Sequence, residues 1–135
     1  TKLEINTPAW GVTLTEDFIK GTFTPDLKFG AFKHFHSRNS LDDEIKASFL
    51  QKRYLDQSDK IDEYVLNKEV FEKYGADCEI FFQCGYLFRK MNDSLVEEIC
   101  EHWMEEIKKC GIQDQISFHY VCKKYKEHIK EIIRP

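Results

Sequence analysis

The sequence contains no long hydrophobic run. No apolar stretch approaches the roughly 18 residues that a membrane-spanning helix needs, and the N-terminus has no basic segment leading into an apolar one. Neither a signal nor a membrane segment is visible, so we expect a soluble domain, and the compartment stays open. The 135 residues fit one domain, 1–135, which we expect to be incomplete at its N-terminus because the chain begins without Met.

An excess of positive charge is also missing. Lys and Arg number 20 against 24 Asp and Glu, which gives a net charge of −4 and an isoelectric point near 5.7. A nucleic-acid-binding surface would need a broad basic field, so we exclude nucleic acid as the partner. One local basic cluster is interrupted by acidic residues and predicts a solvated helix face; it consists of Lys123, Lys124, Lys126 and Lys130.

Cysteine occurs five times but never in a close pair. A zinc or redox site of the CxxC kind is therefore not indicated, and the odd count argues against a closed disulfide framework. Cys100 and Cys122 fall on apolar faces of predicted helices, where we expect reduced thiols in the core. The motifs of dinucleotide-binding proteins, P-loop NTPases, α/β-hydrolases and zincins are missing as well, which lowers support for those functions.

The pattern that is present alternates strands with amphipathic helices. Strands are predicted near Leu3 and at 29–34 and 78–88, and the last is apolar on both faces, as a central strand would be. Helices are predicted at 15–20, 41–55, 61–75, 94–110 and 114–132, with N-caps at Thr15, Ser40, Ser94 and Asp114. This order predicts the α/β class, with a small mixed sheet flanked by helices.

Polar residues gather between the strand at 29–34 and the helix that follows it; they are His34, His36, Arg38, Asp42, Asp43 and Glu44. Strand ends of this kind border ligand crevices in open α/β sheets. His34 and His36 can bind a metal, Arg38 can grip a phosphate, and Glu44 can accept a hydroxyl proton or orient Arg38. The alternative is that the acidic residues favour the helix dipole and the histidines lie on the surface.

A second polar group opens the predicted last helix; it consists of Gln113, Asp114, Gln115, Ser117, His119 and Tyr120. Asp114 can act as a base or bind a sugar hydroxyl, and Gln115 offers both a donor and an acceptor. The alternative is an Asp cap with solvated neighbours. Gly85, in the middle of the strand at 78–88, indicates a bulge, a close approach to the backbone, or ordinary packing against a neighbouring element.

Two stretches, AFKHFHSRNSLDDEI and CGYLFRKMNDSLVEEICEHWMEEIKKCGIQDQISFHYV, resemble a family of GT-A-like glycosyltransferases first described as a domain of unknown function. The resemblance covers roughly residues 29–125. Members combine a strand leading into His, Arg and Glu, a strand with Gly and Arg, a Trp-bearing helix and an RDQxSF block. The matching positions are His34, Arg38, Glu44, Gly85, Arg89, Trp103, Glu106, Asp114, Gln115, Ser117 and Phe118.

This chain departs from the family pattern at two points. Gln113 stands where an Arg usually precedes Asp114, and the spacing from His34 to Arg38 is one residue longer, so that His36 is an alternative partner. The family's acidic strand-end motif, which often holds a divalent metal, Mn or Mg, is not found in this sequence. Without these principal ligands we expect weak donor binding.

The resemblance implies the C-terminal part of a GT-A fold that transfers a hexose from a nucleotide-sugar donor to a glycan or another hydroxyl acceptor. It assigns catalysis to Asp114 and Glu44, metal contact to His34 and His36, and substrate binding to Arg38, Gly85, Arg89, Gln115 and Ser117. Two alternatives stay open. One is a noncatalytic domain of the same fold that binds a glycan or a protein, and the other is a protein-interaction module that docks through its charged helices.

Overall fold

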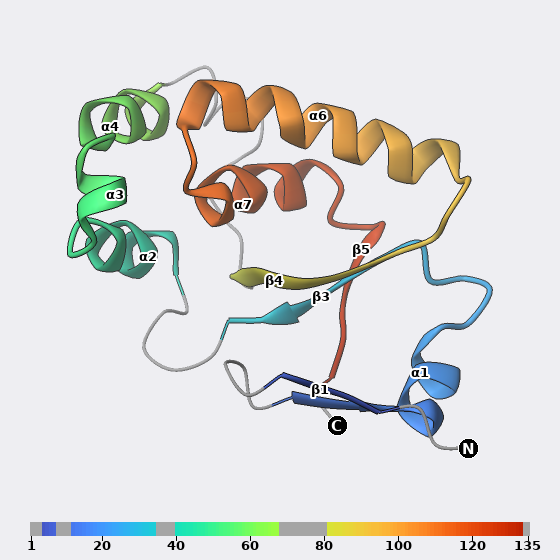
Figure 1. Ribbon diagram of the computed structural model, residues 1–135. Helices are drawn as coiled ribbons and strands as arrows, with labels where there is room; N and C mark the ends of the chain where they lie inside the picture. The colour runs from blue at the N-terminus through green and yellow to red at the C-terminus, as the bar shows by residue number, and fades with distance from the viewer. Residues whose placement is uncertain (1–3, 8–11, 35–39, 68–80, 134–135) are drawn as a thin grey trace.

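The computed structural model describes residues 4–7, 12–34, 40–67 and 81–133, and it shows an α/β fold (Figure 1). The strands are β1 (Glu4–Thr7), β2 (Val12–Thr15), β3 (Phe29–Lys33), β4 (Phe82–Arg89) and β5 (Ile129–Glu131). The helices are α1 (Glu16–Thr22), α2 (Leu41–Ser48), α3 (Lys52–Leu55), α4 (Ser58–Leu66), α6 (Ser94–Cys110) and α7 (Asp114–Lys124). None of these helices combines the length and apolar character that a bilayer crossing requires.

A three-stranded mixed sheet organises the described residues, in the order β4-β3-β5. β3 pairs antiparallel with β4 and parallel with β5, while β1 and β2 form a separate antiparallel pair. Figure 1 shows α6 and α7 over one face of the sheet and α2, α3 and α4 stacked beside its end. The predicted class and the small mixed sheet flanked by helices are confirmed. Among the described strands β3 is in the middle and β4 at the edge, so a central position for β4 stays a prediction.

Three apolar clusters hold these layers together. The first joins the sheet to α6 and α7 through residues such as Phe29, Ile99 and Phe118. The second packs α4 against α7, with Ile61 and Tyr120 fully or almost fully buried. The third lies on the other face of the sheet, where α1 residues pack around buried aromatic rings of β3 and β4. Helices α6 and α7 therefore cover one face of the sheet, and α1 contributes Phe18 and Ile19 to the packing on the other.

The predicted helix at 41–55 is divided in two, because α2 ends at Ser48 and α3 begins at Lys52. The Ser48 hydroxyl donates to the backbone oxygen of Glu44 at 2.7 Å, a back-bond that competes with helix continuation. The N–H groups of Leu50 and Gln51 then bond three residues back instead of four, which tightens and ends the turn. The predicted helix at 61–75 corresponds to α4, which ends at Leu66. The rest of the predicted range, from residue 68 on, lies outside the described residues.

Local capping was predicted correctly at two helices and one residue off at the other two. Thr15 and Ser40 accept N–H bonds from Phe18 and Asp43, as expected. Asp93 rather than Ser94 caps α6, because its carboxylate reaches two backbone N–H groups of the first turn. Gln113 rather than Asp114 is the N-cap of α7.

The end of the chain differs most from the prediction, since the last helix stops at Lys124 and residues 129–131 form β5. Ile129 and Ile132 are buried against the sheet, so their apolar spacing reflects strand packing rather than a helical stripe. Lys123 is buried and stacks over the Tyr120 ring, which corrects its assignment to a solvated face. Lys124, Lys126 and Lys130 are exposed as expected.

Candidate functional site

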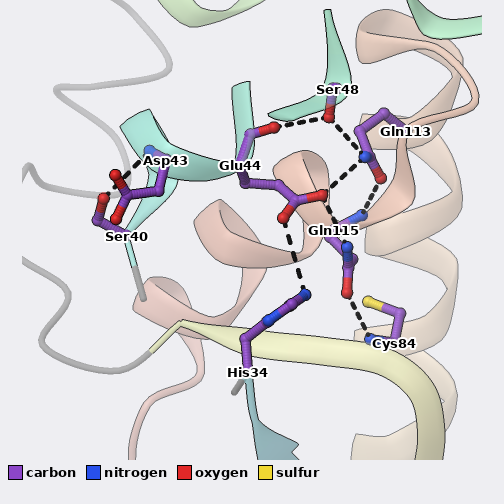
Figure 2. A network of polar contacts seen from close by, with 8 residues as sticks. All are labelled: His34, Ser40, Asp43, Glu44, Ser48, Cys84, Gln113 and Gln115. Carbon is purple, nitrogen blue, oxygen red and sulfur yellow. Dashed lines mark hydrogen bonds and ion pairs between the residues drawn. The ribbon is translucent and has the colours of Figure 1, made fainter. Parts of the chain in front are cut away.

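The two predicted polar stretches meet where β3 ends, beside α2, α7 and β4 (Figure 2). Glu44, in the first turn of α2, is fully buried at the centre of the contact. Its Oε1 accepts hydrogen bonds from the side-chain amides of Gln113 and Gln115, both at 2.9 Å. Its Oε2 lies 3.7 Å from Nε2 of His34. A single carboxylate therefore joins residues that are 69 and 71 positions away along the chain.

The chemistry of Glu44 sets the direction of the surrounding hydrogen bonds. The Glu44 Oε1 accepts from both glutamine amides, which turn their NH₂ groups towards it. The Gln115 oxygen then faces β4 and accepts the backbone N–H of Cys84 at 3.2 Å. The Gln113 NH₂ also donates to the Ser48 hydroxyl at 2.7 Å, and its oxygen accepts the N–H of Gln115 at 3.4 Å. We call this set, His34, Glu44, Ser48, Gln113, Gln115 and the N–H of Cys84, the Glu44 network.

His34 enters the network from the end of β3. Its backbone N–H donates to the oxygen of Phe81 at 2.7 Å, which anchors it beside the start of β4. Its ring lies 5.9 Å from the Phe81 ring, and Phe81 in turn lies 5.5 Å from the ring of His119. The imidazole is therefore held between an apolar wall and the Glu44 carboxylate, and it is 7% exposed.

Asp114 lies at the start of α7, next to the network and half-buried. Burial raises the pKa of its carboxyl above the ordinary value, while the positive charge of Arg53 acts in the opposite direction. Asp114 is thus a carboxyl group with access to solvent and an increased proton affinity, as a general acid or base requires. Arg53, an exposed residue of α3, was not among the predicted site residues.

Ser117 is occupied by hydrogen bonds within the protein. It is fully buried, its hydroxyl donates to the backbone oxygen of Asp114 at 3.0 Å, and it accepts from the indole N–H of Trp103 at 3.1 Å. The Trp103 ring packs 4.7 Å from the ring of Phe118 and is partly buried against the first apolar cluster. These contacts fix the first turn of α7, which carries Asp114 and Gln115.

The remaining predicted residues make no side-chain contact with the network or lie outside the described residues. Gly85 is exposed in an irregular part of β4. Arg89 pairs with the first residue of β3, at the opposite end from His34, and donates to the sulfur of Cys100 at 3.4 Å. His36 and Arg38 lie outside the described residues. The structure thus brings His34, Glu44, Asp114 and Gln115 together and separates Arg89 from them.

Two polar residues at this place, Ser48 and Gln83, were not singled out from the sequence, and Gln113 was placed in the second polar group without a role of its own. Gln113 and Ser48 complete the network through the contacts given above. Gln83 is fully buried in β4, and within the described residues its side-chain amide has no hydrogen-bond partner. Its signal in the sequence was a lone polar residue in the apolar run 80–88, immediately before Cys84 and Gly85.

The described residues do not by themselves form a metal site. In this part of the chain no group of three or more His, Cys, Asp or Glu lies close enough to hold an ion. His34 can offer one ring nitrogen, but the Glu44 oxygen beside it belongs to an internal network. Mn²⁺ and Mg²⁺ bind best to carboxylate and carbonyl oxygens and to water. Metal contact by His34 and His36 stays a prediction, and we derive no chemical step through a metal.

The cysteines within the described residues are free thiols: Cys84, Cys100, Cys110 and Cys122. Burial raises the pKa of the Cys110 thiol to about 12 and the pKa of the Cys84 thiol well above its ordinary value. Both therefore stay protonated near neutral pH and act as small apolar side chains. Cys122 is buried as expected, whereas Cys100 is only partly buried.

A second polar cluster lies between α4 and α6. Glu106, 2% exposed, accepts the Tyr64 hydroxyl at 2.8 Å and lies 3.4 Å from Nε2 of His102. The other ring nitrogen of His102 lies 3.3 Å from the Tyr125 hydroxyl. Burial and the hydrogen bond to Glu106 raise the pKa of Tyr64, so Tyr64 remains a neutral donor. This cluster ties α4 to the long helix α6.

No family model, curated protein or solved structure matches this chain.

Proposed function

We propose that this chain is the acceptor-side part of a GT-A-like glycosyltransferase, which transfers a hexose from a nucleotide-sugar donor to a hydroxyl acceptor. The family resemblance motivates the proposal. Its main structural support is the Glu44 network, because the network joins the two stretches on which the resemblance depends, around His34 and around Asp114. A shared site for one ligand requires that these stretches lie together.

We assign different roles to the two carboxylates. Asp114 is half-buried, has a raised pKa and lies at a helix N-terminus, so it is our candidate for the base or acid that meets an acceptor hydroxyl. Glu44 is fully enclosed, so we assign it to positioning: it holds Gln115 against β4 and His34 at the end of β3. The predicted substrate contacts of Gln115, Gly85 and Arg38 belong to the same proposal.

The test is donor binding and turnover by the chain. Wild-type protein would be titrated with UDP and GDP, with and without Mn²⁺, in a calorimeter, and then assayed for transfer or hydrolysis of UDP- and GDP-hexoses. We expect Asp114→Asn to lower turnover by roughly 10²–10⁴-fold with little change in folding, as loss of a general acid or base does. Asp42→Asn, an exposed carboxylate of α2, serves as the control and should leave turnover unchanged.

The second candidate function is a noncatalytic glycan-binding domain of the same fold. The observation that favours it is the enclosure of Glu44, which leaves Asp114 as the partly exposed carboxylate beside the network. Binding of the chain to glycans on an array would support this candidate if calorimetry detects no nucleotide binding and no donor is turned over. Turnover that Asp114→Asn leaves intact would remove Asp114 from the catalytic role.

A further inference from the structure

Strand β4 contains an irregular segment beside the Glu44 network. Between Ala31 and Lys33 the chain of β3 advances by two residues, whereas their partners on β4, Leu87 and Phe82, are five residues apart. β4 therefore carries three extra residues here (5 − 2), which is a bulge. Bulges redirect side chains and are common beside binding sites. The bulge contains Gln83 and Cys84, and the N–H of Cys84 is held by Gln115.

Gln83 has a costly environment in this bulge. It is 0% exposed, and neither its Oε1 nor its Nε2 has a hydrogen-bond partner within the part of the chain that the structure describes. Leaving one buried polar atom without a partner costs about 1–3 kcal/mol. The Tyr86 hydroxyl, from the same bulge, is also buried and also has no hydrogen-bond partner among the described residues. Packing alone does not account for an amide here, because a leucine would fill similar space without this cost.

The chemistry of the amide restricts what would satisfy it. Gln83 presents two N–H donors and one carbonyl acceptor side by side and carries no charge. A pair of neighbouring hydroxyl groups matches this pattern, since each hydroxyl both donates and accepts. The following residue, Cys84, donates its backbone N–H to the side chain of Gln115, which comes directly after Asp114 in α7. The segment that carries Gln83 therefore borders the turn that carries the proposed acid or base.

We propose that the side-chain amide of Gln83 binds two neighbouring hydroxyl groups of the hexose, and so contributes to sugar selection. The inference rests on the proposed function for the identity of the ligand as a sugar. Since Gln83 is enclosed in the structure, binding includes a local opening of the bulge beside Gly85, the exposed glycine of this segment.

The first experiment uses the whole chain and free sugars. The side-chain amide signals of Gln83, identified by their loss in Gln83→Leu, are followed by ¹⁵N NMR while glucose, galactose, mannose or N-acetylglucosamine is added at millimolar concentration. At least one sugar should shift the Gln83 amide signals, and Gln83→Leu should weaken binding of that sugar at least about tenfold. Gln51→Leu removes an amide that bonds to Arg53 at the surface and should leave sugar binding unchanged.

The second measurement is stability without ligand. Gln83→Leu should unfold at an equal or higher urea concentration than wild type, because it removes a buried amide without a partner. A clear loss of stability would show that the amide has a structural partner, and unshifted Gln83 signals with every sugar would show that the amide does not bind these sugars. Either result overturns the inference.

The inference and the proposed function can fail separately. Sugar-induced shifts at Gln83 without turnover of any nucleotide-sugar would leave the inference standing and remove the transferase. Equal turnover by wild type and Gln83→Leu would remove the inference and leave the transferase.

Discussion

At the scale of single residues, the molecule buries several polar side chains, and the carboxylate of Glu44 connects one group of them, His34 and Gln113 together with the half-buried Gln115. The family resemblance assigned roles to His34, Glu44, Asp114 and Gln115, and residue types at strand and helix ends were compatible with those roles without requiring them. The enclosure of Glu44 could not be predicted, because its partners, Gln113 and Gln115, come from a distant segment. Tertiary packing decides which carboxylate stays accessible.

His119 provides a prediction on pH. Burial, with a contribution from the charge of Lys123, lowers the pKa of His119 to about 3, so the folded protein keeps the ring neutral. The unfolded chain binds this proton below about pH 6.5. Stability should therefore fall as the pH is lowered from about 6.5 towards 3, by up to about 1.4 kcal/mol per pH unit from this residue.

Urea unfolding of wild type, His119→Phe and His128→Phe between those pH values measures this effect. His119→Phe should show a shallower dependence on pH, whereas His128→Phe, a substitution at an exposed position, should follow wild type. Identical pH dependence in wild type and His119→Phe would mean that His119 is protonated in the folded state.

At the scale of elements, local signals fixed helix beginnings better than helix ends. The caps at Thr15 and Ser40 depend on contacts three residues away and are visible in the sequence. The end of the predicted last helix is the strand β5 instead, because these residues pair in parallel with β3, about 100 residues earlier in the chain. The apolar spacing of Ile129 and Ile132 fits either structure, so the sheet decides between them.

Glycine substitutions test two element boundaries. Gly111 ends α6 with φ of +109°, and an added Cβ would meet the Gln57 amide oxygen, which accepts the N–H of Ile112 at 2.9 Å. Gly111→Ala should cost about 1–3 kcal/mol of unfolding free energy. Gly21, in α1, has no neighbouring heavy atom within 4 Å of an added Cβ. Gly21→Ala should stabilise by about 0.5–1 kcal/mol.

Chemical denaturation of both glycine variants gives the comparison directly. The account of the α6 end is wrong if the two alanine variants change stability in the same direction, because only Gly111 combines positive φ with a blocked Cβ position in the described residues.

The junction of α4 and α6 can be tested with neighbouring glutamates. Glu106→Gln replaces the charge that accepts the Tyr64 hydroxyl and faces His102, and it should cost about 1–3 kcal/mol. Glu105→Gln changes an exposed residue that pairs with Lys108, so it should have little effect on stability. Equal losses in the two variants, measured by thermal unfolding, would show that the buried contact adds nothing.

At the scale of the whole molecule, a small mixed sheet flanked by helices brings the end of β3, the start of α2 and the start of α7 to one place (Figure 1). The α/β class followed from the alternation of elements. The break between α2 and α3 did not, because it depends on Ser48 and its contact with Gln113. The proposed transferase needs the complete arrangement, since its two polar stretches belong to different parts of the chain.

A double-mutant cycle between Glu44 and Gln115 tests this arrangement most directly. The unfolding free energies of wild type, Glu44→Gln, Gln115→Leu and the double variant are compared, with Glu44→Gln and exposed Glu63→Gln as the reference pair. We predict a coupling of about 1 kcal/mol or more for Glu44 with Gln115, and additivity for the reference pair. Additivity of Glu44→Gln and Gln115→Leu within about 0.3–0.5 kcal/mol would contradict the account, because the two stretches would then not share a hydrogen-bonded centre.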